Sequence, residues 1–162
     1  MQQANAAFSR RDWAEAERLC RLILNAQADD FDALNLLGII AAQTRRAPEA
    51  AELFERAAAA KPDDALAHNN LGHALHDLKR FEEALGSYDR AIKLNPDYAA
   101  AFYNRGNTLQ ELKRWDEALA SYDRALTIRP GDAKTHNNRG NTLHELRRFG
   151  EALAGFDQAI AL

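Results

Sequence analysis

The feature that most constrains this sequence is a repeat with a period of 34 residues. Gly38, Gly72, Gly106 and Gly140 lie 34 residues apart. The same step relates an alanine series (Ala16, Ala50, Ala84, Ala118, Ala152), an aromatic series (Phe54, Tyr88, Tyr122, Phe156) and a proline series (Pro62, Pro96, Pro130). A fixed period of this length indicates a stack of identical supersecondary units. The predicted units are residues 1–30, 31–64, 65–98, 99–132 and 133–162, which form a single array with incomplete first and last members.

Each unit is predicted to contain two helices. In the third unit, residues 65–78 and about 82–94 carry small or apolar side chains three and four positions apart, as in amphipathic helices. Pro62, Pro96 and Pro130 stand where the second helix must end, because proline cannot continue a helix. Asp64 and Asp132 are expected to cap the following helices. No alternating strand pattern occurs, so the fold class is all-α.

Two sets of residues predict how the helices pack. A glycine inside a helix costs roughly 1 kcal/mol relative to alanine, so Gly72, Gly106 and Gly140 are expected to allow close approach of the partner helix. The expected contacts are Ala84, Ala118 and Ala152, with Phe81, Trp115 and Phe149 filling the turn end of each hairpin. Arg105 and Arg139 occupy the slot of Leu37 and Leu71. Their stems are expected to pack while their head groups pair with carboxylates, for which the candidates are Asp89, Asp123 and Asp157.

Pairs of basic residues recur between the two helices of the units. They are Arg10-Arg11, Arg45-Arg46, Lys79-Arg80, Lys113-Arg114 and Arg147-Arg148. Cations favour the C-terminal end of a helix dipole, so these pairs are predicted to close the first helices rather than to form a binding rim.

These residues together resemble the tetratricopeptide repeat. The period, the helix–turn–helix unit and the order Leu71-Gly72, Leu75, Ala84, Tyr88, Ala91 and Pro96 carry the resemblance, which covers essentially the whole chain. The first unit departs from it, because its opening turn is missing and Cys20 stands in the aromatic slot. The resemblance implies a right-handed superhelical solenoid of antiparallel helix pairs, whose first helices line a concave groove. It also implies a protein-interaction scaffold that grips a peptide or a partner segment in that groove.

The expected groove consists of polar residues on the first helices, opposite the Leu–Gly seam. In the third unit they are Asn69, Asn70, His73, His76 and Asp77; in the fourth Tyr103, Asn104, Asn107, Gln110 and Glu111; in the fifth Lys134, Asn137, Asn138, Asn141, His144 and Glu145. Stacked units align Asn70, Asn104 and Asn138, whose amides can both donate and accept hydrogen bonds. Two interpretations stay open for this asparagine ladder: bonds to a peptide backbone, or bonds between repeats. The aligned carboxylates of Asp77, Glu111 and Glu145 favour either a cationic partner or an ordinary solvated face.

Other kinds of partner and chemistry are not predicted. The net charge of −3 lacks the basic excess of a nucleic-acid binder. No apolar run reaches the roughly 18 residues of a membrane span, and the N-terminus has no signal-peptide pattern, so a cytoplasmic location is expected. The histidines are too far apart for a metal site, only Lys134 suits a carboxylate clamp, and no catalytic constellation is present. The sequence therefore predicts no enzyme activity, no metal and no cofactor within these residues.

The last helix suggests association. Leu153, Phe156, Ile160 and Leu162 are predicted to form an uncovered apolar face, and such a face usually marks an interface. Self-association through it, or cover by further native sequence, is expected. Two alternative functions remain beside the scaffold. One is a substrate-recognition arm of a larger enzyme, such as a glycosyltransferase resembling bacterial O-GlcNAc transferases. The other is a self-assembling structural scaffold.

Overall fold

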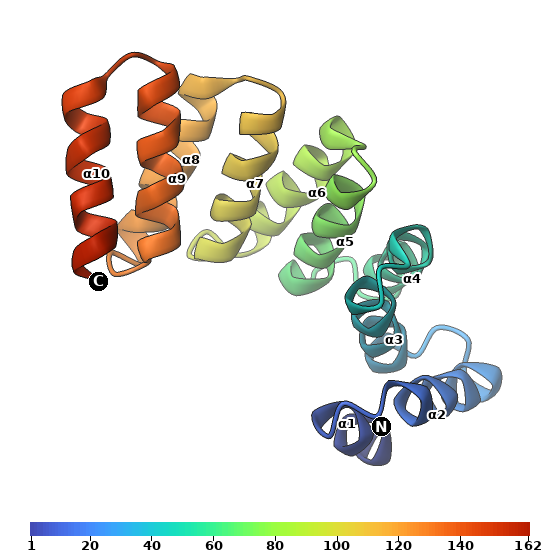
Figure 1. The fold of residues 1–162 in the computed structure, drawn as a ribbon. Helices are drawn as coiled ribbons and strands as arrows, with labels where there is room; N and C mark the ends of the chain where they lie inside the picture. Colours follow the sequence, from blue (N-terminus) through green and yellow to red (C-terminus); the bar gives the residue numbers. More distant parts are fainter. The chain divides into compact units, whose positions relative to one another are not determined.

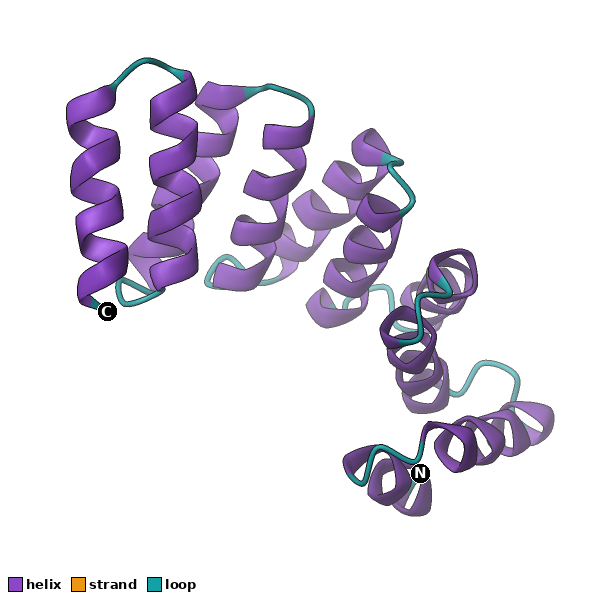
Figure 2. Cartoon of the chain, in the orientation of Figure 1, coloured by secondary structure: helices purple, strands orange, loops and turns teal.

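The computed structural model describes residues 1–162 and consists of helices joined by short turns (Figures 1 and 2). The helices are α1 (Gln2–Ser9), α2 (Trp13–Ala26), α3 (Phe31–Gln43), α4 (Ala47–Ala60), α5 (Ala65–Asp77), α6 (Phe81–Leu94), α7 (Ala99–Glu111), α8 (Trp115–Ile128), α9 (Ala133–Glu145) and α10 (Phe149–Ala161). There is no strand, as predicted. No helix is long and apolar enough to cross a membrane.

The chain forms two compact units, Met1–Arg80 and Phe81–Leu162. In the first unit α1 packs against α2, α2 against α3, α3 against α4 and α4 against α5. In the second unit the helices from α6 to α10 pack in sequence order in the same way. The predicted helix pairs are confirmed, and α1 is shorter than the other first helices. Asp64 and Asp132 accept hydrogen bonds from backbone N–H groups in the first turns of α5 and α9, which confirms both as caps.

The apolar cores of the two units differ in composition. In the first unit Leu34, Leu37, Ile40 and Phe54 are almost fully buried within one apolar cluster. In the second unit the corresponding faces also bury four hydroxyl side chains, namely Thr108, Ser121, Thr135 and Thr142. Three of these hydroxyls donate to helix carbonyls four residues earlier, and Thr135 donates to Asp132, so each buried polar group is satisfied.

The helix glycines make room for an aromatic ring. A Cβ atom built on Gly106 would lie 2.6 Å from Cε1 of Tyr122, and one on Gly140 would lie 2.6 Å from Cε1 of Phe156. Gly38 stands in the same relation to Phe54. For Gly106 and Gly140 the prediction of close approach is right, but the expected alanine partner is wrong, because the nearest atoms belong to the ring at the aromatic position of the second helix. Gly38, Gly106 and Gly140 are therefore required by the size of that ring.

The basic residues between paired helices have two different roles. Arg11, Arg45, Lys79, Lys113 and Arg147 each adopt a left-handed backbone, with φ between 57° and 61°. In the α7–α8 turn the N–H of Lys113 donates to Gln110 and that of Arg114 to Leu109, which ends the helix as a Schellman motif. The residues after them, Arg46, Arg114 and Arg148, instead begin the second helices and pair with a glutamate three positions on. The prediction that both members of each pair close the first helix is therefore wrong for Arg46, Arg114 and Arg148, whose charges pair at the start of the second helices.

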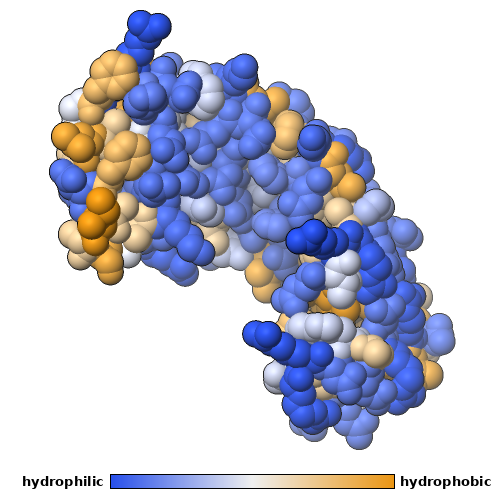
Figure 3. Space-filling model, viewed as in Figure 1, coloured by the Kyte–Doolittle hydropathy of each residue, from blue (hydrophilic) through white to orange (hydrophobic).

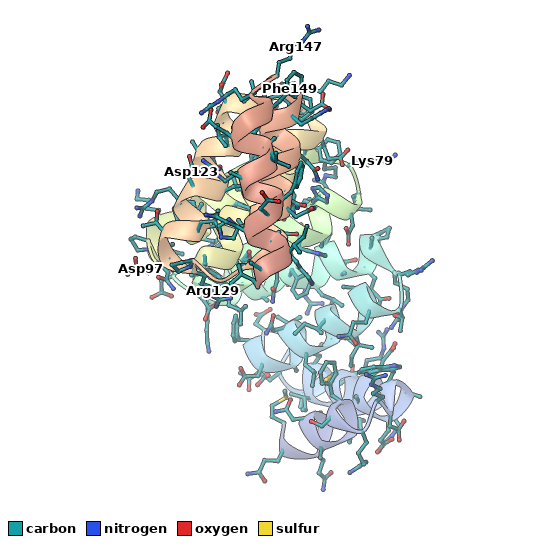
Figure 4. The ribbon with its side chains drawn as sticks, turned by 60° about the vertical axis from the view of Figure 1, so that its left-hand side comes forward. Lys79, Asp97, Asp123, Arg129, Arg147 and Phe149 are labelled. Carbon is teal, nitrogen blue, oxygen red and sulfur yellow. The ribbon has the colours of Figure 1, made fainter.

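Phe149 is the second difference at the turns. It was expected to fill the end of the last hairpin, but its side chain is exposed, and its ring lies 5.3 Å from the His144 ring between centroids in a T-shaped arrangement. Arg147 and Phe149 lie together at the tip of the α9–α10 hairpin (Figure 4).

Ion pairs join successive repeats in the second unit. Arg105 on α7 donates through Nε to Asp89 on α6 at 2.7 Å and through Nη1 to Ser121 on α8. Arg139 on α9 pairs with Asp123 on α8 in the same geometry. Both arginine side chains are only about one-quarter exposed, so the stems pack as predicted. The predicted partners Asp89 and Asp123 are confirmed, while Asp157, one repeat further on, makes no ion pair.

A four-residue charge network joins α2 to α4 in the first unit. Glu17 accepts hydrogen bonds from both Arg46 and Arg21 at 2.7 Å, and Glu49 accepts from the same two arginines. These bonds, first that from Arg46, lower the pKa of Glu17 from 4.5 to about 2. The network holds the first two hairpins together through groups that must stay ionised.

The Glu17 network predicts a specific loss of stability in acid. Because the pKa is lower in the folded state, the stabilisation is complete above 4.5 and is lost as the pH falls towards about 2. Unfolding by urea, measured from about pH 6 to about pH 2, should show a steeper loss for the wild type than for Glu17→Gln. Glu55→Gln, which removes an exposed carboxylate of α4, should keep the wild-type slope. Identical slopes for wild type and Glu17→Gln would contradict the prediction.

Candidate functional site

A hydrogen-bond network across α7, α8 and α9 organises the polar side of the second unit. The Tyr122 hydroxyl lies 2.7 Å from both Asn107 Oδ1 and Gln110 Oε1, and these two oxygens share its single proton. Asn138 Nδ2 donates to Asn107 Oδ1 at 2.9 Å and to the Tyr103 hydroxyl at 3.2 Å. Gln110 Nε2 reaches the next repeat, where it donates to the Asn138 carbonyl and to Thr142 Oγ1.

Tyr122 is the buried centre of this network. Its side chain has no exposed surface, and burial raises the pKa of the phenol well above its usual range. The hydroxyl is therefore protonated and serves as a fixed donor. Four of the predicted groove residues (Tyr103, Asn107, Gln110, Asn138) are thus brought together, and their amide groups orient one another between adjacent repeats.

Next to the network, the exposed ends of α7 and α9 enclose a shallow hollow of about 410 Å³. Gln110 and Glu111 line it from α7, and Asn141, His144 and Glu145 line it from α9. Lys113 and Trp115 complete the wall. Two carboxylates face one ammonium group here, so the hollow carries a net negative charge beside an aromatic ring.

A second hollow, of about 400 Å³, lies at the other end of the same helices. Predicted residues Tyr103, Lys134, Asn137 and Asn138 line it, together with Phe156 and Ile160 of α10. Lys134 and Asn137 are exposed. This hollow is more apolar than the first and contains the single cation of the predicted set.

In the first unit some of the predicted residues on α5 are buried or half-buried and others are exposed. Asn70 donates through Nδ2 to Asn35 Oδ1 of α3 at 3.0 Å, which is a bond between neighbouring repeats. Asn69 is buried, whereas His73 and Asp77 are exposed and lie 3.5 Å apart between Nδ1 and Oδ2. His76 of α5 and Asn104 of α7 are half-buried.

Neither metal nor nucleophilic chemistry is indicated by the geometry. No three His, Cys, Asp or Glu side chains are grouped so that they could hold a metal ion. Cys20 is buried, and this burial raises the pKa of its thiol. The polar side chains of α7, α8 and α9 instead form hydrogen bonds with one another.

Three residues of this region were not singled out from the sequence as parts of it. Trp115 was assigned to the turn, yet it borders the hollow on α7 and α9. Thr142 and Asn35 take part in bonds between repeats. Asn35 and Thr142 could have been found from the repeat, because they lie 34 residues from Asn69 and Thr108. No sequence pattern shows which side of the turn a tryptophan faces.

Four family models match the sequence. One, described as TPR repeat, matches residues 72–113, and three, described as tetratricopeptide repeat, match residues 1–65, 53–86 and 99–132. Together they cover residues 1–132 without a gap. No curated protein matches the chain.

Solved structures share the fold over nearly the entire chain. The crystal structure of MamA gives a TM-score of 0.92 at 24% identity and covers 99% of this chain and 94% of its own. A structure of MamA AMB-1 gives 0.81 at 27% identity, with 99% and 88% covered. YrrB, described as a TPR protein with an unusual peptide-binding site, gives 0.82 at 26% identity, with 98% and 81% covered.

Proposed function

We propose that this chain, which belongs to the tetratricopeptide repeat family, is a scaffold that binds a peptide or partner segment along its first helices. The observation that carries the proposal is the hollow lined by Glu111, Asn141, His144, Glu145 and Trp115, beside a fixed amide network. YrrB, a relative in fold, is described as having a peptide-binding site.

The chemistry of the hollow favours a basic partner. Glu111 and Glu145 offer carboxylates, and Trp115 offers an aromatic face that attracts a guanidinium or an ammonium group. Asn141 is exposed and supplies an amide that can bond the backbone of an extended segment. The internal network supports this role because the bonds of Gln110 hold α7 against α9 and fix the wall of the hollow before a partner arrives, which lowers the entropy lost on binding.

A library of random peptides, selected on the immobilised full chain, tests this function. Peptides with Lys or Arg should be enriched, and the double variant Glu111→Gln/Glu145→Gln should bind them about tenfold more weakly, since each exposed pair contributes about 0.2–1 kcal/mol. The matched control is Glu52→Gln/Glu55→Gln, which removes two exposed carboxylates from α4 without touching the hollow.

Circular dichroism should show the same helicity for both double variants, because all four carboxylates are exposed. Equal binding of the selected peptides by both variants, or no enrichment over an unrelated helical protein, would exclude the acidic hollow as the binding site. The asparagine ladder is the poorer target for such a test, because Asn70 and Asn138 also hold repeats together.

A further inference from the structure

The outer face of α10 repeats the features of two interior helices but lacks a cover. Leu85 on α6 and Leu119 on α8 are 6% and 8% exposed, whereas Leu153, at the same position on α10, is 62% exposed. Ile160 and Leu162 extend this face, at 84% and 65% exposed. Figure 3 shows apolar side chains gathered over α10. The α10 face is defined here as Leu153, Asp157, Ile160 and Leu162.

The interior helices show what covers such a face. Leu119 packs against Leu143 of α9, with Leu146 beside them, and Asp123 pairs with Arg139. Leu85 packs in the same way against Leu109 and Leu112 of α7, and Asp89 pairs with Arg105. In both cases the covering helix carries Arg at position i, with Leu at i+4 and i+7, all on one face.

The charge on the α10 face matches that pattern. Asp157 lies between Leu153 and Ile160 in the sequence of α10 and corresponds by the 34-residue offset to Asp89 and Asp123. Those two aspartates each receive an arginine Nε from the covering helix, whereas Asp157 makes no ion pair. The α10 face thus presents apolar side chains and a carboxylate at the same positions as α6 and α8. Those two helices are covered by α7 and α9, which both carry the pattern Arg-x-x-x-Leu-x-x-Leu.

We propose that the α10 face is a docking surface for a helix of another protein, with Arg facing Asp157 and the two Leu residues covering Leu153. The surface is separate from the hollow on α7 and α9. The proposal therefore does not rest on peptide binding there, and either can fail without the other.

A second copy of this chain is a poorer occupant. Its α1 carries Gln3, Ala7 and Arg10 at the three positions of the pattern, and Ala7 is already fully buried. The exposed side chains of α1 are mostly polar, so it offers no leucine to Leu153. Two copies meeting through α10 about a twofold axis would bring Asp157 towards its own symmetry mate, because an isologous interface pairs a patch with itself.

A labelled peptide with the sequence of residues 132–146, held helical by a cross-link on its polar face, provides the probe. The cross-link is needed because isolated helices of this length are marginal in water. Fluorescence anisotropy should show binding to the full chain. Leu153→Gln should weaken it about tenfold or more, because burial of a leucine contributes about 1.5–3 kcal/mol. Asp157→Arg should weaken it about fivefold.

The decisive arm exchanges the charges. A peptide carrying Arg139→Asp should bind Asp157→Arg better than it binds the wild-type chain, and Glu55→Arg should bind both peptides as the wild type does. Absence of peptide binding, or no preference of the exchanged peptide for Asp157→Arg, would overturn the proposal. So would light scattering that shows a dimer dissociated by Leu153→Gln, because a second copy would then cover the face, or a longer native chain whose residues after Leu162 abolish peptide binding, because the chain itself would then cover it. Leu153 and Asp157 are exposed, so neither substitution should unfold the chain.

Discussion

Gly106→Leu should lower the free energy of unfolding by about 3 kcal/mol or more, at the upper end of overpacking costs. The Cβ atom alone would lie 2.6 Å from Cε1 and 2.8 Å from Cζ of the Tyr122 ring. That ring is fully buried, and its hydroxyl is held in the inter-repeat network, so it cannot move aside without breaking those bonds. Equilibrium unfolding in urea measures the loss.

The matched control is Gly86→Leu, the same substitution in α6. A Cβ atom on Gly86 would meet nothing within 4 Å, and the residue is exposed. Because glycine within a helix costs roughly 1 kcal/mol, this variant should be as stable as the wild type or more stable. If both variants lost the same stability, the ring contact at Gly106 would not be the cause.

Tyr122→Ala is expected to destabilise the second unit by about 3–5 kcal/mol, the usual cost of removing a buried aromatic ring. The ring fills the space left by Gly106 and packs with Leu85, Leu109 and Ala118. Its hydroxyl adds the donor for Asn107 and Gln110. Thermal and urea unfolding should both report the loss.

Tyr122→Phe separates the two contributions. It keeps the ring and removes only the hydroxyl, so the expected cost is about 1–2 kcal/mol, the range for a lost buried hydrogen bond. The aromatic position of the second repeat is occupied by Phe54, which shows that this position accepts the smaller ring. A Tyr122→Phe variant as unstable as Tyr122→Ala would mean that the network, and not ring packing, dominates.

The fold could be predicted from the sequence because its signals are repeated in phase. The 34-residue offset, the prolines and the capping aspartates each mark the same helix boundaries, and the structure confirms them. The Arg105 and Arg139 pairs were also predictable, since an arginine in a leucine slot needs a carboxylate within its reach. The glycine partner was not, because a periodic small residue does not tell which neighbour takes up the space it leaves.

The candidate site was predictable to a smaller extent. The sequence placed the polar residues on the first helices, but which amides bond to one another depends on distances between helices. Asn107 and Asn138 are both predicted groove residues, and for Asn138 the sequence leaves open whether it bonds a peptide or a neighbouring repeat. In the structure Asn138 Nδ2 donates to Asn107 Oδ1 at 2.9 Å, which is a bond between adjacent repeats. The uncovered apolar strip of α10 was expected, and the exposure of Leu153, Ile160 and Leu162 agrees with that expectation. Phe156, expected in the same strip, is instead half-buried, because its ring packs over Gly140.

The left-handed turns between paired helices have a practical consequence for the design of stable variants. At all five, an arginine or lysine occupies a conformation that costs an L-residue with a side chain roughly 1–2 kcal/mol and that glycine adopts freely. Exchange for glycine is a local change, and the five sites are far apart in sequence, so their gains should add nearly independently. The array could therefore be made more heat-resistant through its turns, with the α10 face left as it is. Exchange at Arg11, Arg45, Lys79 and Arg147 also leaves the hollow unchanged, whereas Lys113→Gly would remove the one ammonium group that lines it.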